Sequence, residues 1–73
     1  MEELKKMLRD KFPNVDFDEE KELVSNGIID SLDVVEIISD IQDLFDITIT
    51  MEYMQTSNFE SLETMWNMIE DLQ

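Results

Sequence analysis

One stretch decides the fold of this chain: Gly27-Ile28-Ile29-Asp30-Ser31-Leu32-Asp33-Val34-Val35-Glu36-Ile37-Ile38-Ser39-Asp40-Ile41-Gln42-Asp43-Leu44-Phe45. It starts with the only glycine of the sequence and continues as a run of apolar residues at helical spacing. Aspartate and serine are both strongly preferred at the N-cap of a helix. We therefore predict a helix over residues 32–45, with Asp30 or Ser31 as its N-cap.

The predicted helix carries two kinds of apolar residue. At about 100° per residue, one group falls within roughly a third of the circle and forms a core-facing stripe. The stripe consists of Val34, Ile37, Ile38, Ile41, Leu44 and Phe45. Leu32 and Val35 lie off this stripe, on the side that carries Glu36, Ser39 and Asp43.

Two interpretations of Leu32 and Val35 stay open at this point. Single apolar residues are common on protein surfaces, but an apolar centre inside a charged rim is also typical of a docking face. The predicted rim consists of Asp33, Glu36, Asp40 and Asp43.

The rest of the chain also has helical signals. Apolar spacing predicts helices over residues 2–12, where Pro13 ends the first one, and 62–72, with Ser61 as N-cap. We predict one all-α domain over residues 1–73, a four-helix bundle with one short helix and a long loop between helices 1 and 2.

The connections are predicted to be held by their own apolar residues. In the loop over 14–30 these are Val15, Phe17, Leu23, Val24, Ile28 and Ile29. Asp18 is expected to cap a short turn there, and Asn26-Gly27 suits a turn with positive φ. Residues 47–50 are predicted to be an extended connector that places Ile47 and Ile49 in the core. Residues 51–54 form at most one helical turn, and 55–60 form a loop anchored by Phe59.

The composition is strongly acidic. Asp and Glu number 19 against 5 Lys and Arg, which gives a net charge of −14. This balance excludes an ordinary nucleic-acid binder and argues against docking on anionic membranes. It favours basic protein partners. A hydrophobic share of 42% is too high for a disordered tail. We expect the protein to be cytoplasmic, since no secretory signal or membrane-length apolar run is seen. We also expect it to be a monomer.

The sequence contains no cysteine and no histidine. A disulfide and a thiolate metal site are therefore impossible, and the commonest general base is missing. The spacing Asp16-x-Asp18-x-Glu20 starts like a calcium loop, but Lys21 and Gly27 occupy the positions that need glycine and glutamate. We predict neither an enzyme nor a metal site.

Ser31 is a weak nucleophile in these surroundings, because only carboxylates are available to activate it. However, the free backbone N–H groups and the dipole of a helix N-terminus favour a phosphate. Asp30 would oppose a phosphate on Ser31 unless a cation compensated its charge.

The residues Gly27-Ile28-Ile29-Asp30-Ser31-Leu32, followed by an acidic amphipathic helix ending in Leu44-Phe45, resemble the acyl carrier protein family. The resemblance covers essentially the whole chain. It implies that Ser31 carries 4′-phosphopantetheine, attached from coenzyme A by a separate phosphopantetheinyl transferase, with Asp30 and Leu32 beside it in the motif. The cofactor thiol would then hold an acyl group as a thioester, so the missing sulfur would be imported.

The same resemblance implies a docking face for the transferase and for acyl or aminoacyl ligases and synthases with basic patches. Its predicted residues are Leu32, Asp33, Val35, Glu36, Ser39, Asp40 and Asp43. Asn58-Phe59-Glu60-Ser61-Leu62 is similar to stand-alone carriers, including D-alanyl carrier proteins, whereas Asp33 is closer to fatty-acid synthesis carriers. The carried group therefore stays open. The alternative from another class is an acidic adaptor or inhibitor without a cofactor, in which Ser31 has no role.

Overall fold

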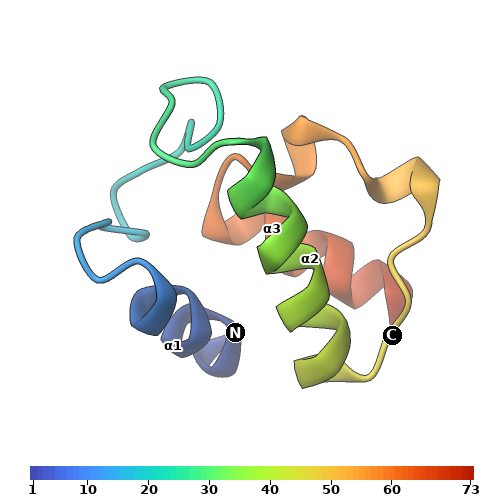
Figure 1. The fold of residues 1–73 in the computed structure, drawn as a ribbon. Coiled ribbons are helices and arrows are strands. Elements are labelled where there is room, and N and C mark those ends of the chain that lie inside the picture. The colour runs from blue at the N-terminus through green and yellow to red at the C-terminus, as the bar shows by residue number, and fades with distance from the viewer.

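The computed structural model describes all residues from 1 to 73 and is entirely helical (Figure 1). It contains the α-helices α1 (Glu2–Lys11), α2 (Ser31–Phe45) and α3 (Leu62–Leu72), and the 3-10 helices η1 (Met51–Tyr53) and η2 (Thr56–Phe59). The predicted all-α class is confirmed. A four-helix bundle is not confirmed, because there are three α-helices and only two 3-10 turns between α2 and α3.

Helix α2 is bounded by an aspartate at each end. Asp30 is its N-cap: Asp33 N–H donates to Asp30 Oδ1 at 2.9 Å, and Asp30 N–H donates to Asp33 Oδ2 at 3.1 Å. These reciprocal bonds form a capping box. At the other end Asp46 adopts the left-handed conformation, with φ 54° and ψ 49°, which commonly ends helices. The helix thus starts at Ser31, one residue before the predicted start.

The ends of α1 and α3 follow local signals. Helix α1 ends at Lys11, one residue before the predicted end, because Phe12 precedes Pro13 and leaves the helical region. Ser61 caps α3 by accepting a hydrogen bond from Thr64 N–H at 3.2 Å. The predicted bounds and N-cap of α3 are confirmed.

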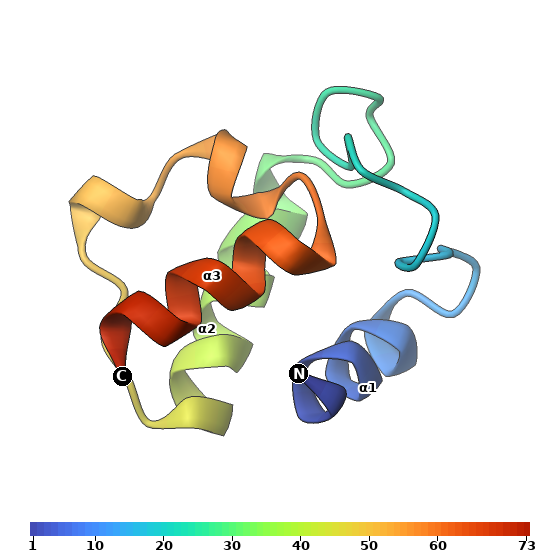
Figure 2. The same ribbon diagram turned by 180° about the vertical axis from the view of Figure 1, so that it is seen from behind.

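The core lies between the three α-helices; in Figure 2, α3 crosses in front of α2 and α1 lies beside them. Its buried apolar side chains are Leu4, Leu8, Phe17, Leu23, Ile29, Ile37, Ile41, Ile49, Phe59, Leu62, Met65, Met68 and Ile69. Most of the predicted α2 stripe belongs to the core or packs against it. The prediction was wrong for Leu44, which is 42% exposed. It lies in the last turn of α2, at an open hollow beside α1 that no other segment covers.

The long connection between α1 and α2 consists of turns and contains no helix. The predicted cap at Asp18 was wrong. Asp16 Oδ1 instead accepts the N–H groups of Asp18 at 3.1 Å and Glu19 at 3.3 Å, since an aspartate readily bonds to the backbone two residues on. Gly27 has φ +70° and provides the predicted positive-φ turn.

The loop residues that were predicted to reach the core do so to different degrees. Phe17, Leu23 and Ile29 are buried, whereas Val15, Val24 and Ile28 are half-buried and pack against the core. Ile49 and Phe59 are also buried, and Ile47 is half-buried, as predicted for the segment after α2. The loop and the 3-10 segments lie at the end of the molecule where α2 begins (Figures 1 and 2).

Candidate functional site

Ser31 lies at the exposed start of α2. The capping bonds at this helix end are made by Asp30 and Asp33, so the Ser31 hydroxyl is not needed to hold the helix start. The first backbone N–H groups of the helix lie beside it, at the positive end of the helix dipole. The result is an accessible hydroxyl on a rigid element.

An apolar hollow of about 280 Å³ opens next to this hydroxyl. Its lining residues come from α2, from the preceding loop and from the segment that leads from η1 into η2: Ser31, Val34, Val35, Ile38, Val24, Met54, Gln55 and Thr56. Five of the eight are apolar, so the hollow suits an aliphatic group better than a charged one. The sequence did not indicate this hollow, because Met54 and Thr56 are distant from Ser31 in the chain.

The two apolar residues that the helical wheel places off the core are strongly exposed. Leu32 is 75% exposed and Val35 is 62% exposed. Ser39 and Asp43 are exposed on the same helix. Asp33, which was also predicted to contact partners, is half-buried and its carboxylate is engaged in the capping box.

Lys11 modifies the acidic rim in a way that the sequence did not reveal. Its ammonium nitrogen lies 2.9 Å from Asp40 and 3.7 Å from Glu36. The hydrogen bond to Asp40, reinforced by the charges of Asp40 and Glu36, raises the pKa of Lys11 above its usual value. Two rim carboxylates are thus partly neutralised by α1, a contact between helices that spacing along one helix cannot show.

The basic residues of the chain are concentrated on one helix. Four of the 5 lie on α1, at Lys5, Lys6, Arg9 and Lys11, whereas α2 carries none. Helix α1 also carries three acidic side chains, whereas all four charged side chains of α2 are acidic, so the two neighbouring elements differ strongly in net charge.

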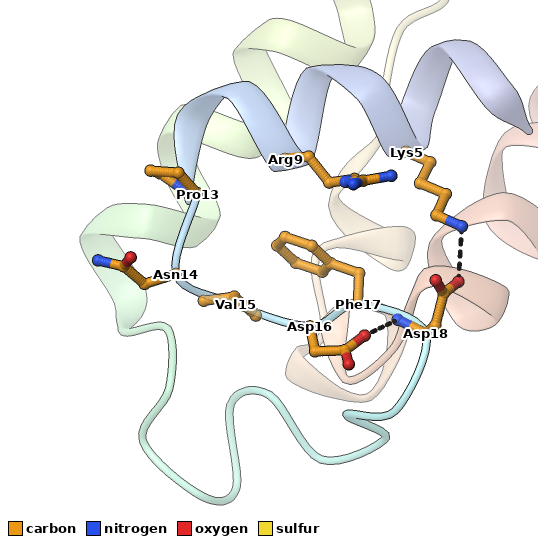
Figure 3. Close-up of a pocket in the computed structure, with 8 residues that line it drawn as sticks. All are labelled: Lys5, Arg9, Pro13, Asn14, Val15, Asp16, Phe17 and Asp18. Carbon is orange, nitrogen blue, oxygen red and sulfur yellow. Dashed lines mark hydrogen bonds and ion pairs between the residues drawn. The ribbon is translucent and has the colours of Figure 1, made fainter.

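A second hollow, of about 370 Å³, lies between α1 and the loop that follows it (Figure 3). Figure 3 shows Lys5 paired with Asp18, at 2.8 Å, and Arg9 extended beside Phe17. The pKa of Asp18 is lowered by its hydrogen bond to Lys5 and by the nearby positive charges. This hollow is polar and shares no lining residue with the one beside Ser31.

Glu60, directly after η2, contacts the loop that leads to Ser31. Its Oε1 accepts Val24 N–H at 2.8 Å and Ser25 N–H at 3.0 Å, and its Oε2 accepts the Ser25 hydroxyl. The bonds from Ser25 and Val24 lower the pKa of Glu60. We did not predict this role from the sequence, where Glu60 appears only as one more acidic residue before a helix cap.

The fold and this site define a small acidic helical protein with an accessible serine at a helix start, beside an apolar hollow. A comparison with family models matches residues 2–66 to the family described as the phosphopantetheine attachment site. The chain belongs to this family and is a carrier protein of the acyl carrier protein family, whose cofactor is covalently attached 4′-phosphopantetheine. Comparisons with curated proteins and with solved structures found no significant match.

The residues present at the start of α2 fit such a cofactor. The Ser31 hydroxyl is accessible, the helix N-terminus favours a phosphate beside it, and the hollow offers apolar surface to the arm that follows the phosphate.

None of the helices is both long enough and apolar enough to cross a membrane.

Proposed function

We propose that Ser31 is the attachment residue and that the protein is an acyl carrier. One observation carries the proposal: the Ser31 hydroxyl is exposed at the start of α2, free of the capping bonds that Asp30 makes, and borders an apolar hollow. When bound, the cofactor supplies a thiol that holds an acyl group as a thioester.

The chain's own residues have supporting roles in this proposal. Asp30 and Asp33 fix the helix start, so that Ser31 is presented in one geometry. The α2 side chains Val34, Val35 and Ile38 offer apolar surface to the arm and to the beginning of its cargo. With no histidine or cysteine in the chain, bond making and breaking at the cargo belongs to partner enzymes.

We propose an acyl cargo, with a D-alanyl or other aminoacyl group as the alternative. The apolar lining of the hollow favours the acyl group, because a charged ammonium would lose hydration there without a carboxylate among the lining residues. Mass analysis of the thioester recovered from the native cell decides this point. A cargo that contains an amine would contradict the acyl assignment and leave the attachment residue unaffected.

The proposed docking face is centred on Leu32 and Val35. Its polar rim comprises Glu36, Ser39, Asp40 and Asp43, and Asp33 holds the helix start beside it. The proposed partners are a phosphopantetheinyl transferase and ligases or synthases with basic patches, which are electrostatically complementary to this rim.

Intact-mass spectrometry tests the attachment residue. After incubation with coenzyme A, magnesium and a broad-specificity phosphopantetheinyl transferase, we expect the mass gain of one phosphopantetheine. Ser31→Ala abolishes the gain, whereas the matched control Ser57→Ala, at an exposed serine in η2 outside the proposed docking face, retains it. A wild-type chain that several transferases leave unmodified would contradict the carrier function, and a gain in Ser31→Ala would move the attachment elsewhere.

A further inference from the structure

Two segments outside the α-helices frame the hollow beside Ser31. Val24 comes from the loop between α1 and α2, and Met54, Gln55 and Thr56 come from the segment around η1 and η2. Neither wall is part of an α-helix, so its position relative to α2 depends on bonds and packing between segments.

Glu60 makes the hydrogen bonds that join these two walls. Its backbone carbonyl accepts Leu23 N–H at 2.8 Å, and its carboxylate accepts the N–H groups of Val24 and Ser25 and the Ser25 hydroxyl. One residue thereby binds three consecutive loop residues through both its main chain and its side chain. We call this set of bonds the Glu60 clamp.

The clamp is continuous with the turn that leads to Ser31. The Leu23 carbonyl, on the clamped residue, accepts Ile28 N–H at 2.9 Å and Ile29 N–H at 3.1 Å. Ile29 is buried, and Asp30 follows it as the N-cap of α2. The backbone from Leu23 to Asp30 is therefore folded back on the clamped residue.

The other side of the clamp is fixed to α3 and η1. Ser61, the next residue, caps α3. Asn58, within η2, donates its side-chain N–H to the Tyr53 carbonyl at 2.8 Å and accepts the Thr64 hydroxyl on its own carbonyl at 3.1 Å. The loop between α1 and α2 is thus attached to residues 58–61, which are themselves hydrogen-bonded to η1 and α3.

We propose that Glu60 is a positioning residue for the modification of Ser31, an inference that rests on the proposed function. Glu60 does not touch Ser31 and acts through residues 23–30. A transferase binds the chain with this turn in one conformation. Without the clamp that conformation is only fractionally populated, and the apparent affinity falls by the same fraction.

Steady-state kinetics of Ser31 modification test the proposal on the full chain, with coenzyme A, magnesium and a phosphopantetheinyl transferase. We expect Glu60→Ala to raise KM for the carrier about tenfold with kcat unchanged, as for a competent conformation populated to about a tenth. Glu60→Gln restores most of the wild-type KM, because its amide oxygen accepts both backbone N–H groups and its amino group donates to Ser25.

The matched control is Glu63→Gln. Glu63 is a neighbouring carboxylate that bonds the exposed Lys21 at 2.7 Å and makes no hydrogen bond or ion pair with residues 23–30. The Glu63→Gln substitution removes one negative charge, as the Glu60 substitutions do, and should leave KM at the wild-type value. A residue with a merely structural role would lower the melting temperature without changing KM in the folded range.

A wild-type KM in folded Glu60→Ala would overturn the proposal. A KM for Glu60→Gln as high as that for Glu60→Ala would also overturn it, because the loss of charge, and not the loss of hydrogen bonds, would then explain the raised KM. If Glu60→Ala does not fold, Ser25→Ala decides: we expect KM to rise about threefold, and no change overturns the proposal. A wild-type chain that is never modified contradicts the proposed function and this proposal with it, whereas a modified wild type with unaltered variants contradicts this proposal alone.

Discussion

Two adjacent residues at the start of α2 have different tasks. Asp30 accepts the hydrogen bond from Asp33 N–H and so satisfies one of the free backbone N–H groups at the start of the helix. Ser31 is then the first residue inside the helix, with its hydroxyl free for other use. Had Ser31 been the N-cap, its oxygen would have bonded to the backbone, which is the common fate of serine before a helix. The aspartate thus makes the accessible serine possible.

Asp18 leads to a prediction about pH. Its lowered pKa, caused first by the hydrogen bond to Lys5, means that the folded state holds the carboxylate more strongly than the unfolded chain. This contribution to stability is present above the unfolded pKa of 3.8 and is lost as pH falls through the lower folded pKa. Asp18→Asn should therefore melt below the wild type at pH 6, and the difference should shrink towards pH 3.

Thermal melts across that pH range check the prediction. Glu19→Gln is the control, because Glu19 is an exposed carboxyl in the same loop without an ion pair. A difference between the wild type and Asp18→Asn that stays constant with pH would show that the ion pair with Lys5 does not contribute to stability.

At the scale of elements, α2 has one face in the core and one exposed face, which we propose contacts other molecules. Ile37 and Ile41 are fully buried, whereas Leu32 and Val35 are exposed. The combined variant Val35→Glu with Glu36→Lys should change the free energy of unfolding by less than about 1 kcal/mol, because both side chains are on the surface. It should lower kcat/KM for transferase modification about tenfold, since interface charges act on association.

Ile41→Ala is the matched control on the opposite face. It removes buried apolar volume and should cost about 2–5 kcal/mol of stability, with kcat/KM unchanged where the variant is folded. Denaturant unfolding and transferase kinetics measure the two quantities. An unaltered kcat/KM in the combined surface variant would place the docking face elsewhere on the molecule.

The elements that could be predicted from the sequence are those with local causes. Pro13 ends α1, Ser61 starts α3, and the apolar stripe of α2 defines its inner face, so each signal acts within a few residues. The class of site was also predictable, since Asp30-Ser31-Leu32 is itself local.

What the sequence could not predict depends on contacts between segments. Leu44 has the spacing of a core residue, yet no segment covers the side of the last turn of α2 on which it lies. Asp16 and Asp18 have the same chemistry, and only the approach of Lys5 decides which one caps and which one pairs. Glu60 finds its loop partners more than thirty residues away.

For the whole molecule, the net charge bears on stability. A net charge of −14 on 73 residues disfavours the compact state through self-repulsion. Added magnesium or moderate salt should screen this repulsion and raise the melting temperature. If screening restores about 1 kcal/mol, the rise is about 4–8 °C for a domain of this size.

Calorimetry or circular dichroism with increasing NaCl and MgCl₂ measures this effect, and an equal osmolality of a neutral solute is the control. A larger rise with magnesium than with sodium at matched ionic strength would reflect its double charge. A melting temperature that ignores both salts would mean that self-repulsion is a minor part of the free energy of folding.

The concentration of basic residues on α1 also gives the molecule a permanent electric dipole. Its less negative end lies at α1, which carries four basic and three acidic side chains, and its more negative end lies towards α2, which carries four acidic side chains and no basic one. In the field of a basic surface such a molecule rotates before it touches, so that α2 leads. The orientational search that slows most protein encounters is thereby shortened, which favours encounters through the proposed docking face on α2.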